Sequence, residues 1–201
     1  MSVRVTPETF SFVDYDNAEI TRLAEKASGD AGLPPDADID VDVVESTPLG
    51  RVKLEEFEAG PPARAVIRVE GGAFENLKAP RKLDPVRTAE TLGRMFLRLH
   101  DMLDPAFGFE GDSEALKIPR QVAWDTYAIG RLSRKGYTVS HDRWQYLWRN
   151  RHGFSDESDL VFEKLWTSDQ LTWDEIRSAS EGLKSDEEIS APKRVPSRPA
   201  R

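Results

Sequence analysis

Residues 38–43 read Asp-Ile-Asp-Val-Asp-Val, a strict alternation of acidic and apolar side chains. Successive side chains of a β-strand point to opposite faces, so this stretch predicts a strand with one apolar and one charged face. Two further runs with strand character follow after turn sequences, at residues 52–57 and 65–69. Three consecutive runs with short connections predict an antiparallel three-stranded meander.

A helix is predicted before this sheet. Asp16, with Glu19 three residues later, is an acidic capping pattern, and the apolar residues that follow recur at helical spacing up to Gly29. We therefore expect a helix over residues 17–28. Residues 1–15 carry enough apolar side chains to pack, but the pattern does not decide whether they form a strand.

After Asp84 the pattern becomes helical. Asp84 is a good N-cap, Pro85 suits the first turn, and apolar residues recur at spacings of three and four up to residue 103. This amphipathic helix is expected to cover the apolar face of the sheet. Further helices are predicted over residues 119–135 and 141–150, after Ser155 and after Thr172.

The predicted fold class is therefore α+β, with an N-terminal helix and a three-stranded antiparallel meander followed by a helical C-terminal half. The chain of 201 residues suits one domain, expected over residues 1–183. Residues 184–201 are basic and rich in proline, which predicts a disordered tail.

Composition limits the classes of function. The chain has no cysteine, which excludes disulfides and thiolate chemistry. No apolar run is long enough for a membrane span, and the N-terminus lacks the apolar region of a signal peptide. A cytoplasmic, soluble protein with no membrane contact is the expectation. The formal net charge of −8 argues against a protein that coats nucleic acid generally.

One segment departs from this acidic composition. Residues 131–152, the basic-aromatic segment, hold six Lys or Arg and one acid, Asp142. Because Trp144 and Trp148 lie four residues apart, they share one face of a helix. Aromatic rings among guanidinium groups are typical of surfaces that stack on single-stranded nucleic acid. The predicted binding residues are Arg131, Arg134, Lys135, Arg143, Trp144, Trp148, Arg149 and Arg151.

A simpler interpretation of the same segment stays open. Amphipathic helices routinely bury aromatic side chains, and the arginines could pair with the acids of residues 153–163. The exposure of Trp144 and Trp148 distinguishes the two interpretations, since stacking on a ligand requires accessible rings.

Other candidate sites are weaker. Asp36, Asp38, Asp40 and Asp42 supply oxygen atoms of the kind that hard cations bind, but neighbours on one strand face are about 6.6 Å apart, so no metal is predicted. No nucleophile elbow, phosphate loop or His-Glu-x-x-His motif occurs, and no cofactor is expected. The rival class is an enzyme, a hydrolase that would use carboxylates with His100 or His141.

The sequence thus predicts a non-catalytic binding protein that uses the basic-aromatic segment as its contact surface. Its partner is an unknown protein or a second copy, because the positive segment could meet the acidic N-terminal part of another chain. A nucleic-acid strand bound through the local basic patch is the alternative ligand.

Overall fold

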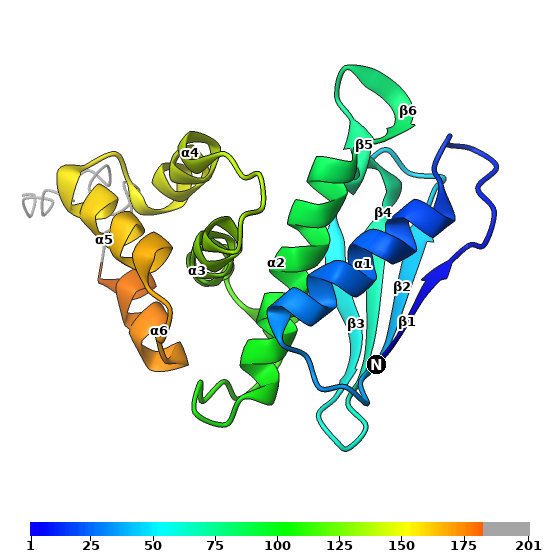
Figure 1. The fold of residues 1–201 in the computed structure, drawn as a ribbon. Helices are drawn as coiled ribbons and strands as arrows, with labels where there is room; N and C mark the ends of the chain where they lie inside the picture. Colours follow the sequence, from blue (N-terminus) through cyan, green and yellow to red (C-terminus); the bar gives the residue numbers. More distant parts are fainter. Residues whose placement is uncertain (183–201) are drawn as a thin grey trace, which may run out of the picture.

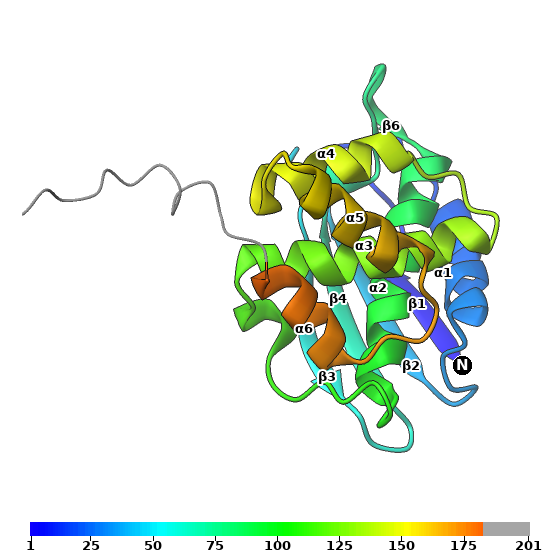
Figure 2. The same cartoon turned by 90° about the vertical axis from the view of Figure 1, so that its left-hand side faces the viewer.

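The computed structural model describes residues 1–182, which form three layers. A four-stranded sheet is the first layer, two helices lie against it as the second, and four further helices form the third (Figures 1 and 2). The chain is thus mixed α+β, as predicted. Among the described residues, no helix has the length and apolar character needed to cross a membrane.

The sheet is mixed, with the strand order β1-β2-β4-β3. Its strands are β1 (Ser2–Thr6), β2 (Asp38–Val44), β3 (Val52–Glu58) and β4 (Arg64–Glu70). β1 and β2 are parallel, β2 and β4 are parallel, and only β3 and β4 are antiparallel. The predicted three-stranded antiparallel meander is therefore wrong, although its three strands exist. The additional strand β1 lies within the N-terminal residues that the sequence left undecided.

The composition of β3 and β4 gives the physical reason for this order. β4 carries Ala65, Ile67 and Val69 on its buried face and Val66 on the other, which suits an interior position. β3 carries four exposed charged residues, and charge is what protects an edge strand from pairing with another chain. The N–H of Leu54 in β3 donates to the Glu114 side chain, 3.2 Å away, which covers part of that edge.

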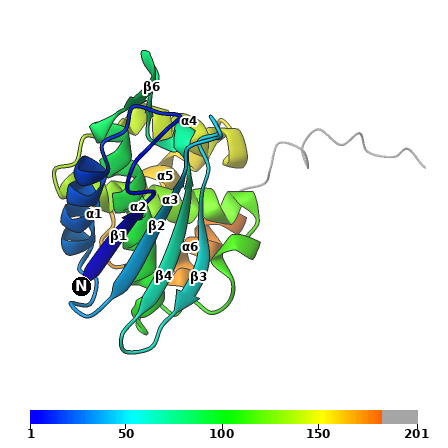
Figure 3. The same ribbon diagram turned by 90° about the vertical axis from the view of Figure 1, so that its right-hand side faces the viewer.

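Helices α1 (Asn17–Ala31) and α2 (Pro85–Leu103) cover one face of the sheet. Their N-caps are the predicted ones, since the Asp16 carboxylate accepts from the N–H of Ala18 and the Asp84 carboxylate from that of Val86. The apolar stripe of α2 packs in the core, as expected for a helix that covers the sheet. Within residues 1–182, no helix covers the other face of the sheet (Figure 3).

The acidic residues of β2 lie on this open face. Asp38, Asp40 and Asp42 alternate with buried apolar residues, as the sequence pattern requires. Arg4 of β1 pairs with Asp38 and Asp40 at 3.8 and 3.4 Å, and Arg68 of β4 pairs with Asp42 at 3.7 Å. The row of acids is thus balanced by arginines on both neighbouring strands. β2 is an interior strand, so these charges do not protect a sheet edge.

The helical half begins after a small hairpin of β5 (Glu75–Asn76) and β6 (Ala79–Leu83), which the sequence did not predict. Its helices are α3 (Ile118–Arg134), α4 (His141–His152), α5 (Asp156–Thr167) and α6 (Trp173–Glu181). Ser140, Ser155 and Thr172 cap α4, α5 and α6, and Thr172 with Glu175 forms the predicted capping box. Residues 184–201, the predicted tail, lie outside the described residues.

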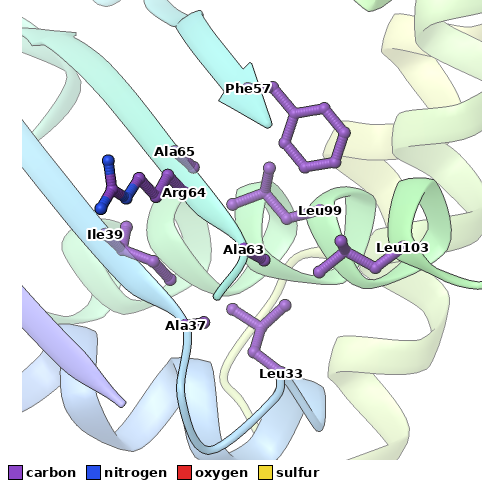
Figure 4. Close-up of a pocket in the computed structure, with 9 residues that line it drawn as sticks. All are labelled: Leu33, Ala37, Ile39, Phe57, Ala63, Arg64, Ala65, Leu99 and Leu103. Carbon is purple, nitrogen blue, oxygen red and sulfur yellow. The ribbon is translucent and has the colours of Figure 1, made fainter. Parts of the chain in front are cut away.

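A small apolar gap of about 10 Å³ lies where β2 and β4 begin. Figure 4 shows that Leu99 and Leu103 of α2 reach it from the helix and Phe57 from β3. Ala37, Ala63 and Ala65 line it with single methyl groups. The gap is too small for more than about one water molecule, so it is a feature of core packing and not a binding site.

Candidate functional site

The basic-aromatic segment of residues 131–152 spans the last turn of α3, a short connection and all of α4. Gly136, with a φ of 85°, lets the chain leave α3, and the Ser140 hydroxyl accepts from the N–H of Arg143 to begin α4. Both devices are local, so the sequence places the segment correctly. Its side chains, however, separate into a buried set and an exposed set.

Both tryptophans belong to the buried set. Trp144 is 7% exposed and Trp148 is fully buried. The Trp144 indole donates to the Glu90 carboxylate of α2 at 3.0 Å, and the Trp148 indole donates to the Ser158 carbonyl and hydroxyl, both at 2.9 Å. The stacking role predicted for these two rings is therefore wrong, because neither face is accessible. They hold α4 against α2 and α5.

Most of the predicted basic residues are paired within the molecule. Arg131 binds Asp101, Arg134 binds Asp169 at 2.7 Å, Arg143 lies 3.4 Å from Glu90, and Arg149 binds Asp159. The Arg149 guanidinium lowers the pKa of the Asp159 carboxyl below its ordinary value. Only Lys135 and Arg151 make no side-chain ion pair or hydrogen bond within residues 1–182. The positive charge of the segment is thus largely balanced inside the protein.

The exposed set forms the outer side of α4 and the turn after it. Six of its members, two basic, one amide and three apolar, are here called the α4 face: Arg143, Tyr146, Leu147, Asn150, Arg151 and Phe154. Tyr146 and Phe154 are 59% and 62% exposed, and their rings contact edge to face with centroids 6.2 Å apart. Leu147 is 37% exposed beside them. Two of the predicted binding residues, Arg143 and Arg151, lie on this face, whereas Tyr146, Leu147, Asn150 and Phe154 were not predicted.

A signal for the α4 face was present in the sequence. Trp144, Trp148 and His152 recur at four-residue spacing, which marks one side of the helix as the packing side. The side chains a half turn away, Tyr146, Leu147 and Asn150, then have to be the exposed ones. Choosing between the two sides requires knowing which one meets α5.

A pocket of about 480 Å³ lies elsewhere, where the end of α2 meets α3 and the α5–α6 connection. Its charged lining comes from Asp101, Asp104, Arg131 and Asp169, and its apolar lining includes Phe107. We call it the α2–α3 pocket. Asp101 is 3% exposed, and its carboxylate accepts from both terminal nitrogens of Arg131 and, at 2.7 Å, from the indole of Trp124. One of the predicted binding residues, Arg131, therefore belongs to this pocket and not to the α4 face.

The three histidines lie apart from one another. His100 lines the α2–α3 pocket, but its Nδ1 atom is 3.8 Å from Asp101, too far for a hydrogen bond. His141 lies 2.9 Å from Glu163 on the surface, outside this pocket. His152 is buried against Trp148, and burial lowers its pKa to about 4. Within residues 1–182, no histidine combines a carboxylate hydrogen bond with the α2–α3 pocket, the arrangement that a hydrolase of the predicted kind requires.

Metal chemistry has no visible centre in the described part of the chain. Within residues 1–182, no group of three or more histidine, aspartate or glutamate side chains is arranged to hold an ion.

Comparison with protein-family models, with curated proteins and with solved structures finds no match to this chain. The α4 face and the α2–α3 pocket are therefore the features of the molecule that point to a function.

Proposed function

We propose that this chain is a non-catalytic binding protein that docks a protein partner on the α4 face. The observation that carries the proposal is the exposed aromatic pair, Tyr146 and Phe154, which pack against each other on the surface. Large apolar side chains that remain exposed and adjacent are typical of protein–protein contact sites. Tyrosine, phenylalanine and arginine are also the residue types enriched at such interfaces.

Charge supports a particular kind of partner. Arg151 is exposed and unpaired within residues 1–182, and the side chain of Arg143 is 53% exposed. One acid, Asp142, is fully exposed one helical turn before Tyr146, so the outer side of α4 carries two basic side chains and one acidic side chain. A complementary partner would present an apolar patch with acidic groups at its rim. Single-stranded nucleic acid is less well matched, because the two indoles that would have stacked on it are buried.

Differential capture from an extract of the source cells tests this proposal. The bait is the full chain, compared with a Tyr146→Ser/Phe154→Ser variant and with a Leu77→Ser control. Leu77 is 79% exposed on the β5–β6 hairpin, so the control removes an apolar surface of similar exposure elsewhere. The proposal requires a protein that the wild type and the control retain and the α4-face variant loses.

The captured protein then has to be purified and its affinity measured directly. We expect binding at least tenfold weaker for the α4-face variant, because an aromatic contact buried at the centre of an interface contributes about 2 kcal/mol or more. Arg151→Glu should also weaken binding of the captured protein, and the loss should be larger at low salt, where charges are screened less. Equal affinity for wild type and variant would exclude the α4 face. Salt-sensitive binding of a fluorescent single-stranded RNA, lost in Arg151→Glu, would instead favour nucleic acid.

A further inference from the structure

The α2–α3 pocket has the size and position of a small-molecule site. Its volume of about 480 Å³ lies within the ordinary range for ligand pockets, of roughly 300–1,000 Å³. It is formed by the last turn of α2, by α3 and by the α5–α6 connection, so it lies between the second and third layers. Pockets that bind ligands occur preferentially at such junctions.

The acidic side chains that line the pocket differ in whether a cationic side chain neutralises them. Asp101 is neutralised by Arg131, and Asp169 by Arg134. Asp104 has no cationic partner within residues 1–182, and the only hydrogen bond of its side chain there is accepted from the N–H of Ala106, at 2.9 Å. One unbalanced negative charge therefore faces the pocket.

His100 lines the pocket one helical turn away. The Nδ1 atom of His100 is buried and has no partner among the described residues. The opposite edge of the ring lies beside Gly32. A Cβ atom added to Gly32 would be 3.6 Å from Cδ2 and 3.8 Å from Nε2 of His100. Because Nδ1 has almost no accessible surface, a ligand in the pocket meets the exposed part of the ring and not this atom.

The helix itself adds to the preference for a cation. His100 lies in the last turn of α2, and Asp104 is the residue that caps the C-terminus of this helix. The carbonyl groups that end a helix give it a partial negative charge, which favours a cation within the last turn. An anion would meet three carboxylates here, while both terminal nitrogens of Arg131 are occupied by Asp101.

From these observations we infer that the α2–α3 pocket binds a small organic amine. Its protonated ammonium group is held by the Asp104 carboxylate. Its apolar body lies against Phe107 and Leu171. This site is separate from the α4 face, so neither depends on the other.

The test uses three probes of one shape and different charge: phenethylamine, 2-phenylethanol and phenylacetate. Binding to the full chain is followed by the shifts of backbone amide signals in two-dimensional NMR. Phenethylamine should shift signals of residues 100–107 and 168–172, while the neutral and anionic probes should shift them at least tenfold less at equal concentration. Equal shifts with all three probes, or no shift with phenethylamine, would overturn the inference.

Variants then assign the contact. Asp104→Asn keeps an oxygen for the N–H of Ala106 and removes only the charge. We expect it to weaken phenethylamine binding by tenfold or more. Glu110→Gln removes one charge from the same loop outside the pocket lining and should bind as the wild type does. Unchanged binding by a folded Asp104→Asn variant would reject the assigned site.

Discussion

Arg131 of α3 holds the carboxylate of Asp101 of α2 with both terminal nitrogens, at 2.8 and 2.6 Å, where the two side chains are 10% and 3% exposed. A second polar contact lies beside it, since Arg94 and Arg98 of α2 both pair with Asp125 of α3. The boundary between the second and third layers is therefore charged as well as apolar. Much of the basic character of residues 131–152 serves this internal packing.

Breaking the Asp101–Arg131 pair should be costly. Asp101→Asn leaves the Arg131 guanidinium buried without a counter-charge, and such losses cost about 3–5 kcal/mol. Urea unfolding followed by tryptophan fluorescence measures the change in the free energy of unfolding. Glu19→Gln is the matched control, because Glu19 pairs with Arg22 at the surface and should contribute less than about 1 kcal/mol. Equal, small effects of both substitutions would show that the buried pair contributes little.

The sequence predicted the helices well because their signals are local. Asp16, Asp84, Ser140, Ser155 and Thr172 each cap the helix that the pattern places after them. Strand order was predicted wrongly because it depends on contacts between distant residues. Nothing near residues 38–43 states that β1 pairs on one side and β4 on the other.

The stacking role predicted for Trp144 and Trp148 was wrong for a related reason. A basic, aromatic composition does not distinguish a surface that binds a partner from a helix that packs inside its own chain. Glu90, which accepts from Trp144, lies 54 positions away in the sequence, and Asp101 lies 30 positions from Arg131. Only the fold brings these acids to the basic segment, so the internal pairing could not be predicted from the segment alone.

Alanine substitutions at two glycines should change the free energy of unfolding in opposite directions. A Cβ at Gly130 of α3 would lie 2.1 Å from the Trp166 carbonyl oxygen of α5, so the two helices would have to separate. We expect Gly130→Ala to lower the free energy of unfolding by about 2–3 kcal/mol. A Cβ at Gly29 of α1 would meet nothing within 4 Å, and Gly29→Ala should raise it by about 0.5–1 kcal/mol. Thermal unfolding compares them, and a stable Gly130→Ala variant would contradict this close packing.

The apolar gap at the start of β2 and β4 offers a stabilising substitution. Ala65 of β4 faces it between Ile39 and Phe57, and valine favours strands. Ala65→Val should raise the free energy of unfolding by about 0.5–1 kcal/mol through added apolar contact. Urea titration gives the value. A decrease of more than about 1 kcal/mol would mean that the surrounding side chains already fill the space.

The buried imidazole of His152 should make stability depend on pH. In the unfolded chain His152 takes up a proton near its ordinary pKa of 6.5, whereas burial lowers the pKa in the fold to about 4. Between these pH values the unfolded chain binds more protons than the folded chain. The stabilisation that the neutral His152 ring contributes is therefore fully present above about pH 6.5 and is lost as the pH drops towards 4. The shift corresponds to a loss of about 3 kcal/mol in total.

His152→Phe isolates this contribution, because a phenyl ring can keep the stacking on Trp148, whose ring centroid lies 3.6 Å from the imidazole, and cannot titrate. Carboxylates also titrate in this range, so the informative quantity is the difference between the two proteins. Urea unfolding at pH 7, 5.5 and 4 should show the wild type losing about 3 kcal/mol more than the variant over that interval. Parallel loss in both proteins would mean that His152 accepts a proton in the folded state as readily as in the unfolded chain, and that the contact with Trp148 and Ser180 does not enforce a neutral ring.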